Sequence, residues 1–175
     1  LDNVLQHFID NAPKEVHRAI HSATQERSIG VGALGFHAYL QKNNIPWESA
    51  QAVGKNLAMF KHIGGGLIKA NINLGEERGE APDAEGWDYR FSHTMAIAPN
   101  ASSSIIMGNT SPSIEPYRAN AYRQDTLSGS HLTKNKFLDK LLASKGLNEE
   151  ELADAWSSII ADDGSVRGLK CLTDW

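Results

Sequence analysis

The chain has 175 residues, with 17 Lys and Arg against 21 Asp and Glu, which gives a formal net charge of −4. This length suits one domain with a hydrophobic core, and the absence of a basic block disfavours direct binding to DNA or RNA. Because no apolar run approaches the roughly 20 residues that span a bilayer and no signal-peptide pattern opens the chain, we expect a soluble cytoplasmic protein without membrane contact.

Helical periodicity dominates the first half of the chain. A first helix is predicted from the apolar residues that fall on one of its faces, which are Leu1, Val4, Leu5, Phe8 and Ile9. Further helices are predicted from Pro13, around residues 36–41 and from Pro46 onward. Residues 64–66 are three glycines inside the last of these, and since each interior glycine costs a helix about 1 kcal/mol relative to alanine, we expect a kink there.

The second half alternates polar segments with short elements. Residues 75–92 are predicted to form a loop, and residues 93–98 a short strand whose pairing partners lie outside this chain. Residues 117–127 read as an irregular or edge strand. Thr133 is predicted to cap a helix, and Asn148 with Glu151 forms a capping-box pattern for the last helix.

The turn after the predicted strand has the composition of an anion-binding loop. Small and hydroxyl-bearing residues lead from it into a helix, and the first N–H groups of a helix lack intrahelical partners and can bind a phosphate without Lys or Arg. The candidate residues are Pro99, Asn100, Ala101, Ser102, Ser103 and Ser104. The alternative is a Ser-rich helix cap without a ligand, and the short segment taken alone favours this alternative.

Two other patterns carry less weight. Residues 30–35 match the dinucleotide fingerprint GxGxxG, but a polar, helix-like stretch precedes them instead of a strand, so close backbone packing is the preferred interpretation. His17 and His21 have helical spacing without a third ligand nearby, which favours surface histidines, and we predict no metal site.

Linked motifs across the chain resemble the large subunit of class I ribonucleotide reductases, in the C-terminal part of the catalytic barrel. They are Pro99-Asn100-Ala101-Ser102-Ser103, Gly108, Ile114-Glu115-Pro116 and Leu127-Ser128-Gly129, in order, with residues 26–32, 35–37 and 77–79 upstream. The resemblance implies an α/β fold: a mainly helical segment of a ten-stranded α/β barrel with a few short strands, forming one incomplete domain over residues 1–175.

The family reduces ribonucleoside diphosphates to deoxyribonucleotides for DNA replication by a radical mechanism. The resemblance implies that residues 99–104 bind the substrate diphosphate, with Glu115 and Arg118 as secondary candidates. It also implies three partners: the substrate, the rest of the large subunit and a small radical-generating subunit. Asn100 departs from the family pattern, which often has Thr or Ser there, so only its backbone contact is expected.

Cysteine content limits what this chain can do by itself. The family needs a thiyl-forming cysteine and a redox-active pair, whereas Cys171 is the only cysteine present. We therefore expect no catalytic residue in this segment, no bound cofactor, and no activity of the chain alone. The parent enzyme is expected to rely on the di-metal radical of its small subunit and on a thiol reductant.

Three alternatives remain open at this point. The chain could belong to the adenosylcobalamin-dependent class, which shares the barrel and a related phosphate loop. It could be a non-catalytic piece that completes a barrel with a separately encoded chain. It could also be a free-standing phosphate-binding module.

Overall fold

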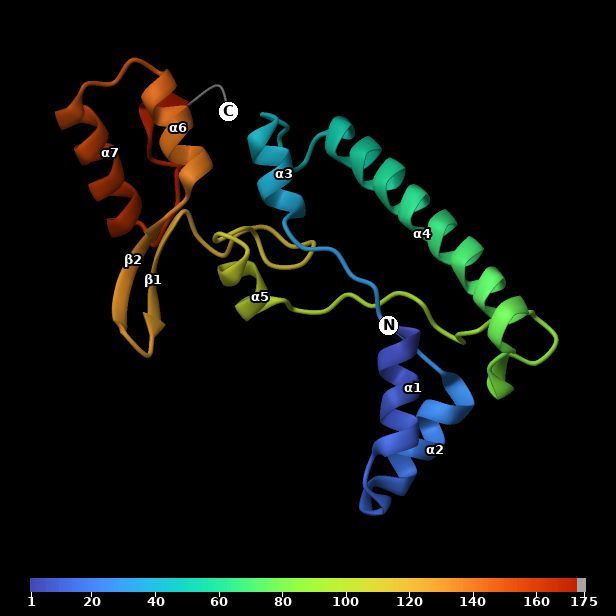
Figure 1. Ribbon diagram of the computed structural model, residues 1–175. Helices are drawn as coiled ribbons and strands as arrows, with labels where there is room; N and C mark the ends of the chain where they lie inside the picture. The colour runs from blue at the N-terminus through green and yellow to red at the C-terminus, as the bar shows by residue number, and fades with distance from the viewer. Residues whose placement is uncertain (173–175) are drawn as a thin grey trace. The chain divides into compact units, whose positions relative to one another are not determined.

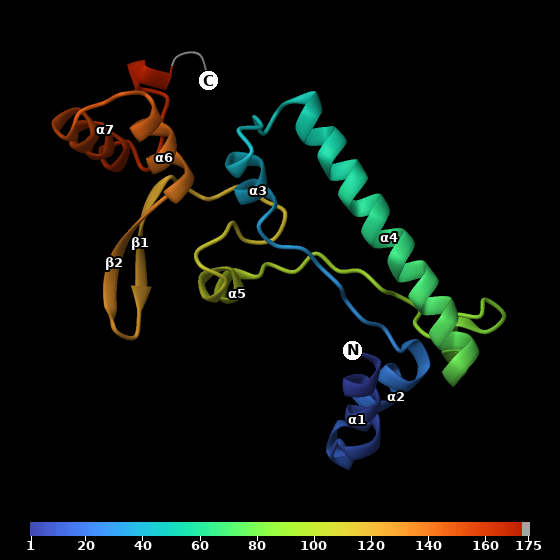
Figure 2. The same cartoon turned by 45° about the horizontal axis from the view of Figure 1, so that its top comes forward.

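The computed structural model describes residues 1–172, and it divides them into two compact units. One unit contains Leu1–Ala33 and Val53–Pro99, and the other contains Leu34–Ala52 and the chain from Asn100 onward. Figures 1 and 2 show the helices and the two strands of these units. The mainly helical content with few short strands agrees with the prediction. The single incomplete domain over residues 1–175 stays a prediction, and residues 173–175 lie outside the described range.

The first unit is helical. Its elements are α1 (Asp2–Asn11), the 3-10 turn η1 (Lys14–Val16), α2 (His17–Glu26), most of α4 (Ala50–Arg78) and the 3-10 turn η2 (Pro82–Ala84). The apolar face predicted for α1 is largely exposed, since Leu1 and Val4 are 68% and 72% accessible. α1 packs against α2. Asp2 of α1 is buried, and its carboxylate is paired with arginines. The predicted helix is confirmed, and its buried residue is Asp2.

Helix α4 runs unbroken over 29 residues. The hydroxyl of Ser49 accepts the Ala52 N–H at its first turn, which satisfies one of the unpaired amides there. The helix does not break at residues 64–66, where the kink is predicted, and it continues to Arg78, past the predicted start of the loop at residue 75. Helix formation is cooperative, so long flanking segments carry three glycines at a modest cost.

Two extended segments of the first unit lie side by side. The N–H groups of Ile29 and Val31 donate to the carbonyls of His93 and Thr94, each at 3.0 Å, and Val31 and Met95 form a parallel bridge. The predicted strand at residues 93–98 is thus reduced to this bridge, and its partner is inside the chain. A Cβ on Gly32 would lie 2.5 Å from the Ala96 carbonyl oxygen, so this contact requires glycine. The packing interpretation of residues 30–35 is confirmed at this position.

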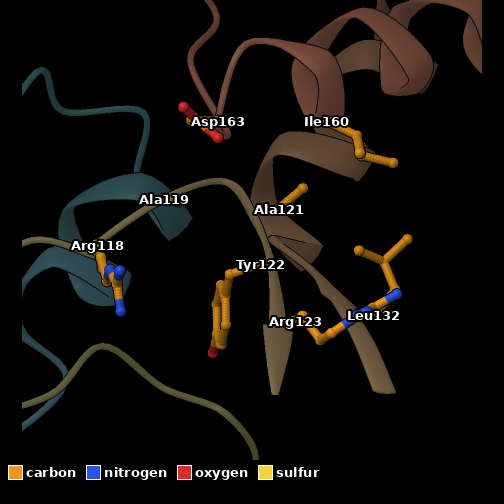
Figure 3. A pocket seen from close by; sticks show the side chains of 8 residues that line it. All are labelled: Arg118, Ala119, Ala121, Tyr122, Arg123, Leu132, Ile160 and Asp163. Atoms are coloured by element: carbon orange, nitrogen blue, oxygen red, sulfur yellow. The ribbon is translucent and has the colours of Figure 1, made fainter. Parts of the chain in front are cut away.

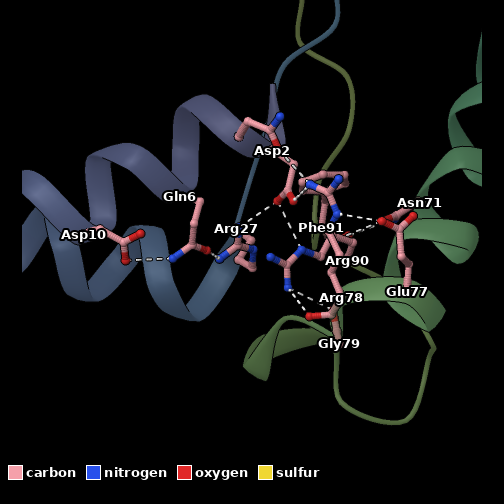
Figure 4. Close-up of polar contacts among 11 residues, drawn as sticks. Asp2, Gln6, Asp10, Arg27, Asn71, Glu77, Arg78, Gly79, Arg90 and Phe91 are labelled. Carbon is pink, nitrogen blue, oxygen red and sulfur yellow. Dashed lines mark hydrogen bonds and ion pairs between the residues drawn. The ribbon is translucent and has the colours of Figure 1, made fainter.

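Buried polar contacts hold the end of α4 against the segment that follows it (Figure 4). The Asn71 side chain accepts the Phe91 N–H at 2.8 Å and donates to the Phe91 carbonyl at 3.0 Å. The carboxylate of Asp2 pairs with Arg27, Arg78 and Arg90. These contacts satisfy groups that would be costly to bury unpaired.

The second unit contains the only sheet among the described residues, a hairpin of β1 (Ala121–Thr126) and β2 (Gly129–Lys134). Its other elements are α3 (Phe36–Lys42), α5 (Ala101–Ile106), α6 (Lys136–Ser144), α7 (Glu149–Ala161) and the 3-10 turn η3 (Lys170–Leu172). The predicted edge strand is confirmed as β1. Thr133 lies in β2 and is not the helix cap: Asn135 caps α6 by accepting the Phe137 N–H.

The hydrophobic core of this unit lies between β1, α6 and α7. Its buried members are Ala121, Leu138, Leu142, Ala155, Trp156, Ile159, Leu169 and Leu172. The capping box predicted for α7 is confirmed, with Asn148 and Glu151 bonding each other's backbone at 2.9 Å. Between residues 1 and 172, no helix has the length and apolar content needed to cross a membrane.

Candidate functional site

The predicted anion-binding loop forms the start of α5. Asn100 occupies the N-cap position in the left-handed conformation (φ 52°, ψ 29°), and its own side chain makes no capping hydrogen bond to the helix. Ala101, Ser102 and Ser103 are exposed. The first amides of a helix lack intrahelical acceptors and can donate to water or to a ligand, and small side chains allow close approach.

The serines of this loop are not equivalent. Ser104 is 6% exposed, and its hydroxyl donates to the Ala101 carbonyl at 2.7 Å. Its hydroxyl is therefore engaged within the helix, whereas Ser102 and Ser103 face solvent. Among the three predicted serines, only these two present accessible hydroxyls.

The turn after α5 is held by hydrogen bonds within the second unit. The Thr110 N–H donates to the Ser104 carbonyl at 3.1 Å, and the Asn109 N–H donates to the Ile105 carbonyl at 3.2 Å. Gly108 has a φ of 79°, and its carbonyl accepts from the Lys136 ammonium at 2.9 Å. The end of α5 is therefore defined by contacts that start in the following segment.

Tyr117 forms hydrogen bonds with both His37 and this turn. The Tyr117 N–H donates to His37 Nδ1 at 3.0 Å, and the Tyr117 hydroxyl donates to the Asn109 carbonyl at 3.0 Å. Burial lowers the pKa of His37 below its ordinary value, so the neutral imidazole is favoured. Burial, with the nearby Tyr122, raises the pKa of Tyr117 to about 12, which keeps the phenol protonated and able to donate.

The two secondary candidates lie on the segment after the turn. Glu115 is exposed. Arg118 lines an open pocket of about 730 Å³, shown in Figure 3. The other residues that line this pocket are Ala119, Ala121, Tyr122, Arg123, Leu132, Ile160 and Asp163. Residues 99–104 are not among its described lining, so this pocket does not unite Arg118 with the loop.

The remaining candidate groups have ordinary surroundings. His17 and His21 are exposed, and no group of three or more metal-binding side chains occurs in the described range 1–172. Cys171 is a half-buried free thiol that packs against the core of the second unit. That it is not catalytic stays a prediction.

Sequence reasoning missed the residues that support the loop. Ser111 is fully buried, and its hydroxyl and carbonyl accept the amides of Ala38 and Gly35 at the start of α3. No local pattern reveals these contacts, because each joins residues more than 70 positions apart. The only sequence signal was that residues 35–37 and residues 114–116 each match a motif of the family.

Comparisons with known proteins agree on one family. A family model described as "Ribonucleotide reductase, barrel domain" matches residues 2–90 and 83–174. The chain is 57% identical over 173 residues to the ribonucleoside-diphosphate reductase large subunit of Invertebrate iridescent virus 3, covering 99% of this chain and 28% of that protein. It is 53% identical over 169 residues to the corresponding subunit of Invertebrate iridescent virus 6, covering 97% of this chain and 18% of that protein.

A solved structure gives the same result. The class Id ribonucleotide reductase alpha subunit of Actinobacillus ureae matches with a TM-score of 0.84 at 42% identity, over 99% of this chain and 31% of that one. The chain therefore spans less than a third of the length of these relatives.

Proposed function

The chain belongs to the ribonucleotide reductase barrel-domain family, and on this premise we propose that it supplies the substrate-diphosphate-binding loop of a ribonucleoside-diphosphate reductase large subunit. Its fold is a partial α/β barrel segment, as predicted. The fold assignment rests on the family match, and the role of the loop rests on the geometry of α5.

The observation that carries the proposal is the exposed start of α5, where small side chains surround the first amides of the helix. Asn100 is the N-cap residue and its side chain makes no capping hydrogen bond, and Ala101 and Ser103 offer no bulk against an approaching anion. The amides at this end would bind the diphosphate oxygens, supported by the hydroxyls of Ser102 and Ser103. α5 spans six residues. Binding through its first amides requires no basic side chain.

The proposed task of the loop is positioning. In the parent enzyme the ribose 2′-hydroxyl would be replaced by hydrogen, with a radical delivered from the small di-metal subunit and electrons from a thiol reductant. Holding the diphosphate fixes the ribose relative to the reacting groups, and such orientation can lower a barrier by up to about 7–11 kcal/mol. The proposal assigns to this segment no cofactor and no catalytic residue.

The proposed partners follow from this role. They are a ribonucleoside diphosphate, the remainder of the large subunit and the radical-generating small subunit, in the cytoplasm. Glu115 and Arg118 stay secondary candidates, because Glu115 is exposed and Arg118 lines a pocket of its own.

Titration of CDP into the chain tests the loop. Replacing Ala101 by Leu should abolish measurable binding by blocking the approach to the amides. Ser103→Ala should weaken binding by one hydrogen bond, about 0.5–1.5 kcal/mol, or roughly 2- to 13-fold in Kd. Ala143→Leu, at an exposed position of α6, is the matched control and should bind as the unaltered chain does. Wild-type affinity in Ala101→Leu would refute the assignment.

A further inference from the structure

We propose that His37 is a positioning residue that holds the segment 109–117, and through it the α5 loop, in the orientation that binds the diphosphate. This inference rests on the proposed function of the loop. His37 lies in the first turn of α3 and does not belong to residues 99–104.

The start of α3 forms hydrogen bonds with the segment 109–117 at Ser111. The Gly35 N–H donates to the Ser111 carbonyl at 2.8 Å, and the Ala38 N–H donates to the Ser111 hydroxyl at 3.0 Å. Both amides belong to the end of α3 that lacks intrahelical acceptors, so Ser111 caps this helix from a distant part of the chain. A Cβ on Gly35 would lie 2.7 Å from the Thr110 hydroxyl, which shows how closely the two segments approach.

His37 provides the second attachment. Its Nδ1 accepts the Tyr117 N–H at 3.0 Å, so this nitrogen carries no proton. The imidazole is held edge-on by Trp47, at a centroid distance of 5.3 Å, and by Tyr117, at 5.5 Å. The lowered pKa of His37 agrees with a ring that stays neutral and keeps this acceptor. The aromatic contacts fix the ring, and the nitrogen fixes the backbone of the segment.

From Tyr117 the connection reaches α5 through the Tyr117 hydroxyl and the backbone of Asn109 and Thr110. The Tyr117 hydroxyl donates to the Asn109 carbonyl, and the neighbouring Thr110 N–H donates to the Ser104 carbonyl inside α5. A continuous series of hydrogen bonds therefore links His37 with the helix whose start is proposed to bind the substrate. Loss of the first acceptor leaves a partly buried N–H unpaired and frees the segment to move.

The chemistry of the acceptor gives matched variants. In His37→Leu the side chain keeps apolar volume beside Trp47 but cannot accept a hydrogen bond. In His37→Asn the amide oxygen can reach the position of Nδ1, so the acceptor is restored with a different side chain. His62→Leu is the control, since His62 is exposed on α4. Tyr117→Phe keeps His37 and removes only the donor to Asn109.

Amide hydrogen exchange over residues 101–117, together with CDP titration of the same 175-residue chain, tests the inference. His37→Leu should exchange about 5- to 150-fold faster at Thr110 and Tyr117, the range expected when a buried donor loses its partner. Its affinity for CDP should fall by a comparable factor. His37→Asn should restore both, and His62→Leu should change neither. Should His37→Leu fail to fold, Tyr117→Phe provides the decisive exchange measurement at Asn109 and Thr110.

The outcomes separate this inference from the function it rests on. If the unaltered chain binds no CDP, the proposed function fails, and the exchange data still decide whether His37 holds the segment. Unchanged exchange in His37→Leu and Tyr117→Phe would overturn the inference. So would faster exchange with wild-type CDP affinity, or a His37→Asn variant that behaves like His37→Leu.

Discussion

The carboxylate of Asp2 lies 2.6 Å from the guanidinium of Arg27 (Oδ1 to Nη2), with each side chain only 7% exposed. The same carboxylate also receives Arg90 at 3.1 Å and Arg78 at 3.0 Å. One acidic residue thus joins α1 to the end of α2, the end of α4 and the segment after it. Asp2 supplies one negative charge to three arginines, so the buried guanidinium groups depend on this carboxylate for charge compensation.

Asp2→Asn should therefore destabilise the chain by about 3–5 kcal/mol, the usual cost of removing one partner from a buried ion pair. Arg27 and Arg90 would keep their charge in a buried position without a counter-ion. Asp10→Asn is the matched control, since Asp10 is on the same helix but exposed, and it should change stability by less than about 0.5 kcal/mol. Urea unfolding followed by circular dichroism measures both, and equal midpoints for the two variants would contradict the prediction.

The same cluster sets a pH dependence. Burial alone would raise the pKa of Asp2, but hydrogen bonds from Arg27, Arg90 and Arg78 outweigh it and hold the pKa below the ordinary value of 3.8. The unfolded chain then binds this proton first, so the stabilisation is complete above pH 3.8 and is lost as the pH falls through the lower folded value. The difference in stability between wild type and Asp2→Asn should shrink in that window. A difference that stays constant from pH 7 to pH 2 would argue against the assignment.

Gly32 and Gly65 should respond in opposite directions to alanine. A Cβ on Gly32 meets the Ala96 carbonyl oxygen at 2.5 Å, so Gly32→Ala must displace backbone and should cost about 1–3 kcal/mol. A Cβ on Gly65 meets no atom within 4 Å, and Gly65→Ala should gain up to about 1 kcal/mol from helix propensity. Denaturant midpoints of the two variants test this. A stable Gly32→Ala chain would show that the two extended segments can separate at no cost.

The 175-residue chain alone should not reduce ribonucleotides. The resemblance implies a need for three cysteines, and the chain has one, packed against a hydrophobic core. The assay combines the chain with CDP, a dithiol reductant and a radical-loaded small subunit, and measures deoxynucleotide by chromatography. Cys171→Ser serves as the background control. Product above that background in the unaltered chain would be incompatible with the prediction.

Local chemistry made several elements predictable from the sequence. The capping box of α7 depends on Asn148 and Glu151, three positions apart, and it formed as predicted. The close approach at Gly32 followed from the absence of a side chain together with the absence of a preceding strand. The linked motifs also identified the family, because their combination over the whole chain is far more specific than any one of them.

Local sequence patterns are insufficient where distant residues decide. Thr133 could have capped a helix by its local sequence, but pairing with Tyr122 placed it in β2 and passed the cap to Asn135. Leu1 and Val4 lie on the apolar face of α1 but are exposed, whereas Asp2 is buried among arginines. In both cases hydrogen bonds or charges from far along the chain outweigh local propensity.

The sequence by itself determined the family, most helices and the small-residue loop at residues 99–104, because these depend on short-range spacing and side-chain size. Only the tertiary structure decided how that loop is supported. His37, Ser111 and Tyr117 carry no shared local signal, and their contacts exist only once α3 and the segment after α5 are packed together. Hydrogen bonds between residues so distant in sequence are set by chain topology, which periodicity and composition do not encode.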